Sequence, residues 1–190
     1  MGNNDSSVET FLQWIKASDN IVFFGGAGVS TESGIPDFRS VDGLYNQKYD
    51  YPPETILSHT FYRKHPQEFY RFYRDKMLCL DAEPNITHYK LAELEKAGKL
   101  KGVVTQNIDG LHQKAGSKNV MELHGSVLRN YCERCLQFVS AEEILNSTGV
   151  PKMSKVRRSG KAGCRIVRGG LKYRKRLRMQ STASVMPMCS

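Results

Sequence analysis

Three short stretches of the chain bring together residue types that can bind a phosphate-containing ligand and move a proton. Residues 25–39 begin with three glycines in four positions, residues 105–109 carry two amides and a carboxylate, and His124 lies between a leucine and a glycine. Glycine backbone can approach a ligand closely, amides and carboxylates give directed hydrogen bonds, and histidine can act as a general base near neutral pH. These stretches therefore predict a nucleotide site with acid–base chemistry.

The glycine-rich stretch directly follows the apolar run 21–24, which predicts a short buried strand. A strand, a glycine turn and a helix start are how α/β folds hold a pyrophosphate, and Ser30 and Thr31 are suited to cap such a helix. The dinucleotide-binding fingerprint has a third glycine where this chain has Thr31. A plain structural turn is therefore an alternative for this stretch taken by itself.

Gln106, Asn107, Ile108 and Asp109 directly follow a second predicted strand. This places them at the carboxyl edge, where open α/β sheets bind their ligands. The two amides and the carboxylate could fix a carboxamide and a ribose through directed hydrogen bonds. The alternative is a capped loop in which Asn107 or Asp109 is the cap.

The string Gly34-Ile-Pro-Asp-Phe-Arg39, with Thr105-Gln-Asn-Ile-Asp-Gly-Leu-His112 and Glu122-Leu-His-Gly-Ser126, closely resembles the bacterial sirtuins, which are NAD-dependent protein deacylases. The resemblance covers residues 8–152. It implies an α/β fold with a Rossmann-like parallel sheet whose second half is incomplete, a small zinc-binding module starting near residue 127, and a helical insertion. It also implies transfer of an acetyl group from acetyl-lysine of a protein or peptide to the ADP-ribose of NAD, with release of nicotinamide.

The resemblance further assigns roles to single residues. Ile108 and Asp109 would hold the nicotinamide carboxamide, and Gln106 and Asn107 would face the ribose. His124 would be the catalytic base, helping to deprotonate a ribose hydroxyl after the acetyl oxygen has displaced nicotinamide. The cofactor-binding residues that it implies are Gly26, Ala27, Gly28, Thr31, Phe38, Arg39, Gln106, Asn107, Ile108, Asp109 and His124.

The remaining histidines are expected to have no catalytic role. His112 falls in a motif and is expected to support its loop. His59, His65 and His88 match nothing in the family and are predicted to be surface or packing residues. A structural histidine is also the alternative for His124.

Cys132 and Cys135 have the Cys-x-x-Cys spacing of half a structural zinc site. The chain has no second such pair, because Cys164 is isolated and Cys189 lies near the end. We therefore expect weak zinc binding, and a redox pair is the alternative. Five cysteines, an odd number, without a signal peptide favour a reducing, cytoplasmic location.

Tyr70 and Tyr73 bear on the choice of acyl group. Sirtuins that remove succinyl groups resemble one another in a Tyr-x-x-Arg pair at this place, and this chain has Tyr73 where the arginine would stand. Arg74 is one residue on, about 100° round a helix. We therefore expect acetyl to be preferred over succinyl, and the alternative is that these aromatics only fill a core.

The spacing of apolar residues and the positions of proline and glycine predict the helices and strands around these motifs. Helices are expected over 8–15, 66–77 and 84–97, and short helices and loops over the aromatic-rich region after Arg39. The second and third strands are expected at 103–105 and 120–123, with a short helix after Asp109. Alternation of strands and helices favours a parallel sheet with helical crossovers. Residues 1–7 are expected to be disordered.

The net charge of +9 arises entirely in residues 153–190, which hold 11 Lys or Arg and no acid. When the degenerate codons of 153–170 are read one nucleotide later, they permit the sequence Cys-x-x-Cys-Gly-Gly, which contains the second cysteine pair of a zinc site. We therefore expect that residues 153–190 are an out-of-frame, disordered tail and that the chain has little activity. A non-catalytic NAD- or ADP-ribose-binding fragment with a basic nucleic-acid-binding arm is the alternative function. Since residues 1–152 are slightly acidic, a nucleic-acid partner is not favoured, and no apolar run suggests a membrane.

Overall fold

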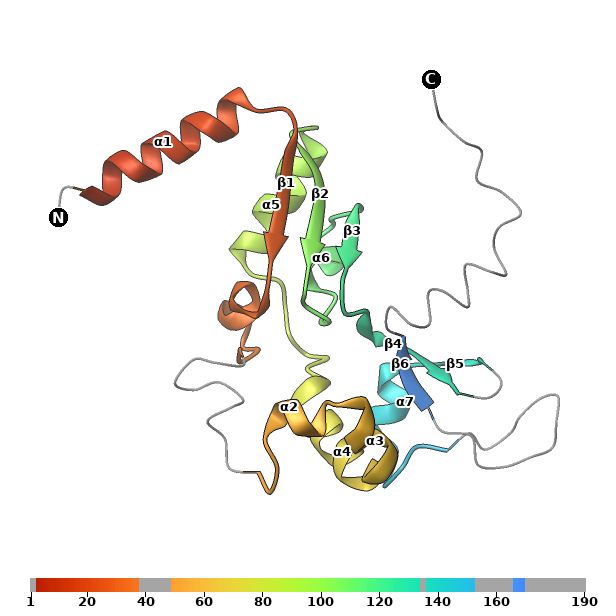
Figure 1. The fold of residues 1–190 in the computed structure, drawn as a ribbon. Coiled ribbons are helices and arrows are strands. Elements are labelled where there is room, and N and C mark those ends of the chain that lie inside the picture. Colours follow the sequence, from red (N-terminus) through yellow and green to blue (C-terminus); the bar gives the residue numbers. More distant parts are fainter. Residues whose placement is uncertain (1–2, 38–48, 134–135, 153–165, 170–190) are drawn as a thin grey trace. The chain divides into compact units, whose positions relative to one another are not determined.

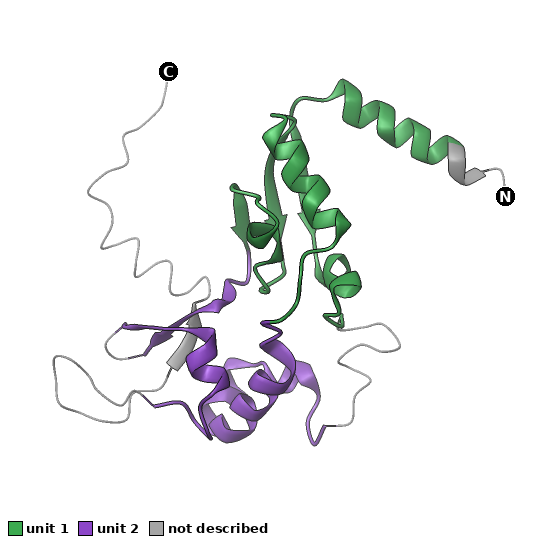
Figure 2. Cartoon of the chain, turned by 180° about the vertical axis from the view of Figure 1, so that it is seen from behind, with its two compact units in different colours: residues 1–47, 81–122 green, residues 48–80, 123–190 purple. Residues whose placement is uncertain are grey.

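The structure is a computed structural model that describes residues 3–37, 49–133, 136–152 and 166–169. The chain divides into two compact units, each made of two separate stretches of sequence (Figure 2). The first unit holds residues 1–47 and 81–122, and the second holds residues 48–80 and 123–190. Each unit has a three-stranded sheet of its own.

A parallel sheet forms the centre of the first unit (Figure 1). Strands β1 (Ile21–Gly25), β2 (Leu100–Thr105) and β3 (Val120–Glu122) lie side by side in that order. Crossovers that contain helices connect them, as parallel pairing requires. The predicted parallel sheet is therefore confirmed, with each strand within three residues of its expected start.

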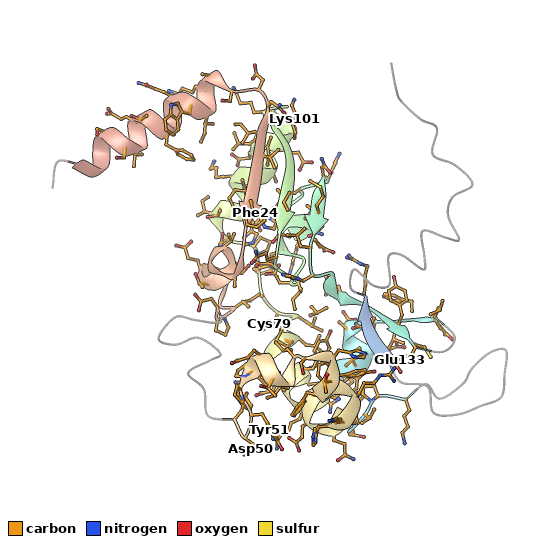
Figure 3. All side chains as sticks on the ribbon, in the orientation of Figure 1. Phe24, Asp50, Tyr51, Cys79, Lys101 and Glu133 are labelled. Atoms are coloured by element: carbon orange, nitrogen blue, oxygen red, sulfur yellow. The ribbon has the colours of Figure 1, made fainter. Side chains whose placement is uncertain are left out.

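Helix α5 (Ile86–Lys96) covers one face of this sheet and begins two residues after Pro84, with Asn85 as its N-cap. The core between helix and sheet consists of Leu91, Leu100 and Val103, with Ile21, Phe23, Leu94 and Val120 packed against it. On the strands, alternate side chains point to the opposite face. There Val22, Phe24 and Met121 are 59%, 62% and 42% exposed, and Figure 3 shows Phe24 projecting from β1. The prediction of a buried strand at 21–24 is therefore wrong for Val22 and Phe24.

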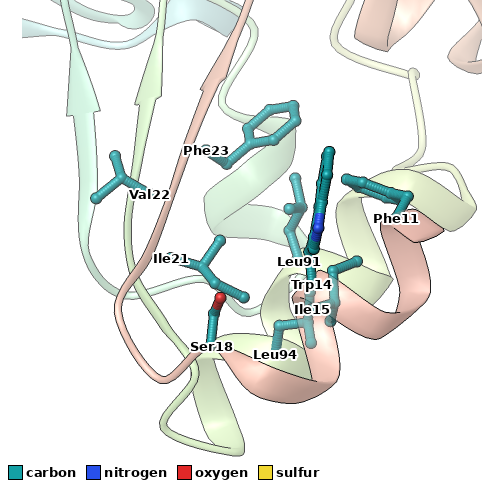
Figure 4. A pocket seen from close by; sticks show the side chains of 9 residues that line it. All are labelled: Phe11, Trp14, Ile15, Ser18, Ile21, Val22, Phe23, Leu91 and Leu94. Atoms are coloured by element: carbon teal, nitrogen blue, oxygen red, sulfur yellow. The ribbon is translucent and has the colours of Figure 1, made fainter.

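Helix α1 (Asn3–Ala17) precedes the sheet, as the apolar spacing predicts. It begins at Asn3, inside the stretch 1–7 that we expected to be disordered, because polar residues in a first helical turn leave no apolar period to read. Apolar side chains of α1 and α5 line a pocket with the start of β1 (Figure 4). Trp14 lines this pocket but is 66% exposed.

Helical elements fill the first part of the second unit. They are α2 (Pro53–Ile56), α3 (His59–Lys64), α4 (Pro66–Phe72) and η3 (Tyr73–Met77), the last of which is one π-helical turn. The helix expected over 66–77 is thus present, with a changed hydrogen-bond pattern at its end. Aromatic side chains dominate the buried residues of α3, α4 and η3, namely Phe61, Tyr62, Tyr70, Phe72 and Tyr73.

A small antiparallel sheet completes the second unit. Strand β4 (Ser126–Cys132) is central and pairs with β5 (Phe138–Val139) and with β6 (Ile166–Gly169). Helix α7 (Ala141–Leu145) follows β5 with a capping box. The strand β6 corrects the expectation of disorder throughout 153–190, because Ile and Val favour a strand where a partner such as β4 is available.

The helices of the described part of the chain are all too short or too polar to cross a membrane.

Candidate functional site

The carboxyl ends of the three parallel strands meet in one row. Gly25 of β1 is in register with Thr105 of β2, and Thr105 is in register with Glu122 of β3. Immediately beyond this row, the backbone N–H of Gln106 donates to the carbonyl oxygen of Gly25 at 3.0 Å. The two loops that follow β1 and β2 therefore leave the sheet side by side, as the motif positions predict.

A polar cluster joins these two loops. The hydroxyl of Ser30 donates to Oδ2 of Asp109 at 2.7 Å, and Nδ2 of Asn107 donates to Oγ of Ser30 at 2.9 Å. Ser30 and Asn107 are 1% and 8% exposed. The structure thus brings two predicted cofactor residues together with Ser30, for which the sequence predicted only a capping role.

Asp109 also caps its own loop, which is the structural role that we considered as the alternative to ligand binding. Its Oδ1 accepts a 2.9 Å hydrogen bond from the backbone N–H of Leu111, at the start of α6 (Leu111–Lys114). Asn107 is fixed by its own backbone N–H, which donates to Oγ1 of Thr105 at 3.0 Å. A carboxylate held in this way is pre-positioned, because both of its oxygens already have a donor and little side-chain freedom is left.

The segment after β1 differs from the prediction. The expected helix capped by Ser30 and Thr31 is instead a 3₁₀ helix, η1 (Ala27–Ser33), in which both residues are internal. Gly26 is its N-cap, and the hydroxyl of Thr31 donates to the carbonyl oxygen of Gly28 at 2.9 Å. Gly25, Gly26 and Gly28 do not have positive φ, whereas Gly34, the C-cap, ends this helix with a φ of 79°, a left-handed conformation that glycine favours.

Two of these glycines differ in what surrounds them. A Cβ on Gly25 would lie 2.6 Å from Cε1 of Phe23, so a side chain there would collide with the protein. A Cβ on Gly28 would meet no described atom within 4 Å. Gly28 therefore leaves bare backbone open on its outer side, as close approach by a phosphate or ribose requires.

A pair of buried histidines lies within the same unit. His88 and His112 are 0% and 1% exposed, and their ring centroids are 4.7 Å apart. Burial, together with the charge of His88, lowers the pKa of His112 to about 4, against the attraction of Asp109. Burial likewise lowers the pKa of His88. Among the described residues, neither ring nitrogen of His112 has a hydrogen-bond partner.

His88 is a residue whose place the sequence reasoning left open. Its Nδ1 accepts from the backbone N–H of Asn85 at 3.2 Å and closes the capping box of α5. The signal was present, because a polar residue three positions after an N-cap residue is the spacing of a capping box. His112 has the supporting position that we expected, next to Phe23 and His88.

The other predicted site residues are found as follows. Gln106 is exposed and Ile108 is half-buried, both in the loop after β2. His124 is exposed in the turn between β3 and β4 and belongs to the second unit. Phe38 and Arg39 lie outside the described residues.

The described residues do not make a complete zinc site. Cys132 ends β4 and is 0% exposed, whereas Cys135 lies outside the described residues. No group of three or more His, Cys, Asp or Glu side chains able to hold a metal occurs in the part that the structure describes. Tetrahedral structural zinc needs four ligands, so the donor set in this part does not fit it.

The chain is similar to known proteins over most of its length. The model of the Sir2 family matches residues 26–178, a range that continues past Lys152, where we expected the resemblance to end. An NAD-dependent protein deacetylase of Clostridium perfringens is 58% identical over 153 residues, which are 80% of this chain and 63% of that protein. One of Clostridium acetobutylicum is 59% identical, over 74% of this chain and 59% of that protein.

Solved structures agree with the sequence comparisons. A Sir2 protein with a deacetylated p53 peptide and 3′-O-acetyl ADP-ribose has a TM-score of 0.71 and 41% identity, over 85% of this chain and 65% of that one. Another, bound to a propionylated peptide, has a TM-score of 0.67 and 39% identity, over 85% of this chain and 63% of that one. This chain thus spans about three fifths of its relatives' length. On the family match over 26–178, the chain belongs to the Sir2 family.

Proposed function

We propose that this chain is the greater part of an NAD-dependent protein lysine deacetylase. The observation that carries the proposal is the polar cluster of Ser30, Asn107 and Asp109 beside the open backbone of Gly28. This cluster lies at the carboxyl edge of a parallel sheet, which is where such sheets bind nucleotides. The relatives' names support the choice of NAD and of an acetylated protein or peptide substrate.

The described residues fit a dinucleotide. Backbone N–H groups of η1 could face the phosphates, because a Cβ added at Gly28 would have no described neighbour within 4 Å. Asn107 and the exposed Gln106 would address the ribose, and Asp109 with Ile108 the nicotinamide carboxamide. Bound NAD would supply an electrophilic ribose carbon and nicotinamide as the leaving group.

His124 is the residue that we propose as the general base. It is exposed and follows Glu122, the last residue of β3, by two positions. A neutral imidazole there could take a proton from a ribose hydroxyl. This role is carried over from the family motif Glu122-Leu-His-Gly-Ser126 and rests on that match.

The acyl preference that we propose is acetyl over succinyl. The hydroxyl of Tyr73 donates to Oδ1 of Asn130 at 3.2 Å, and Tyr73 is 2% exposed, so it belongs to a core. The guanidinium of Arg74 donates to the carbonyl oxygen of Gly149 at 2.9 Å and to Oγ of Ser147 at 3.3 Å. Both side chains are thus already engaged, which favours an acyl group without a carboxylate.

The direct test is nicotinamide release from NAD in the presence of an acetylated peptide. The wild-type chain, for which we expect low activity, should release nicotinamide slowly, and His124→Ala should lower this turnover by a further factor of at least ~100 while it still binds ADP-ribose. A succinylated peptide of the same sequence should react more slowly than the acetylated one. No release above the background of the peptide-free reaction would contradict the enzymatic proposal.

A second candidate is a non-catalytic fragment that binds NAD or ADP-ribose, because the chain spans only 63% of the Clostridium perfringens relative. ADP-ribose binding without nicotinamide release would support it. Its proposed basic arm, 153–190, would give salt-sensitive DNA binding that disappears when the arm is deleted.

For either function we propose a cytoplasmic location. We also propose that Cys132 and Cys135 form half of a zinc site and bind zinc weakly.

A further inference from the structure

The side chain of Asn85 connects two elements that are more than 50 residues apart in sequence. Its Nδ2 donates to the carbonyl oxygen of Val29 at 2.7 Å and to Oγ of Ser33 at 3.1 Å. Its Oδ1 accepts from the backbone N–H of Thr87 at 3.0 Å, as the N-cap of α5. One amide group therefore binds η1 with its donors and α5 with its acceptor.

Capping alone does not explain an asparagine here. Serine and aspartate cap a helix about as well, since a cap needs only an oxygen that accepts from the first turn. Only the amide adds two N–H donors to that oxygen. Both contacts of Nδ2 are made with η1, so the donor side of Asn85 acts on the loop after β1 and not on its own helix.

Within the described residues, η1 also bonds the loop after β2, through Ser30. Its 3₁₀ hydrogen bonds have poorer geometry than those of an α-helix, and a Cβ on Gly28 would meet no described atom within 4 Å. Val29 and Ser33 stand on either side of Ser30, whose hydroxyl bonds Asp109 at 2.7 Å. The two bonds from Asn85 thus hold η1 where Ser30 meets the cluster after β2.

We propose that Asn85 is a positioning residue for the dinucleotide, acting through η1. The inference rests on the proposed function in naming NAD as the ligand. If the loop is ordered for a smaller fraction of the time, the apparent affinity falls by that fraction, whereas the chemistry of the bound state is unchanged. A change at Asn85 should therefore alter the KM for NAD and leave kcat close to its original value.

The test separates the cap from the loop contacts. Asn85→Ser and Asn85→Asp keep an N-cap oxygen and remove both donors, so the melting temperature should change little. The Kd for NAD or ADP-ribose should rise roughly tenfold, because two hydrogen bonds to the loop are lost. Amides within and just after η1, those of Val29, Gly34 and Ile35, should exchange faster with solvent.

Asn119→Ser is the matched control, because Asn119 is exposed in the same unit and its amide contacts the carbonyl oxygen of Lys101, outside η1. It should change neither Kd nor exchange in η1. Ser33→Ala, which removes one acceptor, should raise Kd less than Asn85→Ser and add little to it in the double variant.

Two outcomes would overturn the positioning role, and a third would overturn the proposed function. If Asn85→Ser binds NAD and exchanges in η1 like the wild type, the positioning role is overturned. If the substitution lowers kcat and melting temperature but not affinity, Asn85 is only structural and the inference is again wrong. If the wild-type chain binds neither NAD nor ADP-ribose, the proposed function fails, and exchange in η1 alone decides whether Asn85 orders the loop.

Discussion

The hydroxyl of Ser30 donates a 2.7 Å hydrogen bond to the carboxylate of Asp109, a residue 79 positions further along the chain. The same hydroxyl oxygen accepts from Nδ2 of Asn107. Ser30 is thus the middle member of a donor–acceptor chain that ends on a carboxylate with two donors. Because Ser30 is 1% exposed, water cannot readily replace its hydroxyl.

Ser30→Ala should therefore weaken NAD binding and lower the free energy of unfolding by about 1–3 kcal/mol, since Asn107 and Asp109 each lose a buried partner. Calorimetric titration and denaturant unfolding measure the two effects. Thr10→Ala is the control, because the exposed hydroxyl of Thr10 donates to the carbonyl oxygen of Ser6 within α1, away from the predicted cofactor residues. Equal effects of the two substitutions would mean that the cluster does not hold the ligand site together.

Stability should fall in acid because of His112. Its pKa is lowered from 6.5 to about 4 in the folded chain, so folding favours the neutral ring. The contribution is complete above pH 6.5 and is lost as the pH falls towards 4. The unfolding free energy should decrease by about 2 kcal/mol between pH 7.5 and pH 5 from this group alone.

Denaturant unfolding at the two pH values measures this change. His112→Phe should remove part of the pH dependence, with the remainder due to His88, whose pKa is also lowered by burial. Asp109 attracts both protonated rings and acts in the opposite direction. Unchanged stability of the wild type between pH 7.5 and pH 5 would contradict the prediction.

Much of the sheet could be predicted from the sequence because its signals are local. The apolar runs before Gly25 and before Gln106 mark β1 and β2, and parallel order follows from the helices between them. The carboxyl edge then places Asn107 and Asp109 beside the glycine loop without further information. These signals are short apolar runs and the glycine or polar residues that end them, and they lie within a few neighbouring residues.

The rest depends on contacts between distant residues. Ser30 was predicted as a helix cap, because its partners Asn107 and Asp109 are visible only once the loops are side by side. His88 is an exception: it was predicted to be a surface or packing residue and is buried, and its capping contact with Asn85 is local, so the capping-box spacing could have predicted it. The bonds that Asn85 makes to Val29 and Ser33 also join residues more than 50 positions apart, and no local propensity predicts them.

Lys99 should hold the end of α1. Its Nζ donates to the carbonyl oxygens of Lys16 at 2.8 Å, Ser18 at 3.2 Å and Ile15 at 3.3 Å, and lies 3.3 Å from Oδ1 of Asp19. A cation at a helix C-terminus satisfies carbonyl groups that have no partner within the helix, and it interacts favourably with the helix dipole.

Lys99→Met should therefore increase hydrogen exchange and proteolysis within α1, while the free energy of global unfolding falls by no more than about 1 kcal/mol. Lys101→Met is the matched control, because Lys101 is exposed and its Nζ bonds the carbonyl oxygen of Gly98. NAD binding should be unchanged in both variants. Equal protection of α1 in the two variants would show that Lys99 does not anchor this helix.

Zinc should bind this chain in amounts well below one ion per chain. Cys132 is fully buried at the end of β4, but the described residues offer no group of three or more metal-binding side chains. A site with too few protein ligands gains little folding free energy from the metal, because structural zinc stabilises through a complete tetrahedral shell.

Elemental analysis of protein purified without chelator measures the content, and a chelator should leave the melting temperature unchanged. Cys79→Ser is the control for adventitious thiol binding, because the half-buried Cys79 contacts the carbonyl oxygen of Lys76, away from β4. If Cys132→Ser lowers the residual metal and Cys79→Ser does not, the weak binding belongs to the Cys132 and Cys135 pair. One zinc per chain that resists a chelator would show that the pair has found two further ligands, and the prediction would then be wrong.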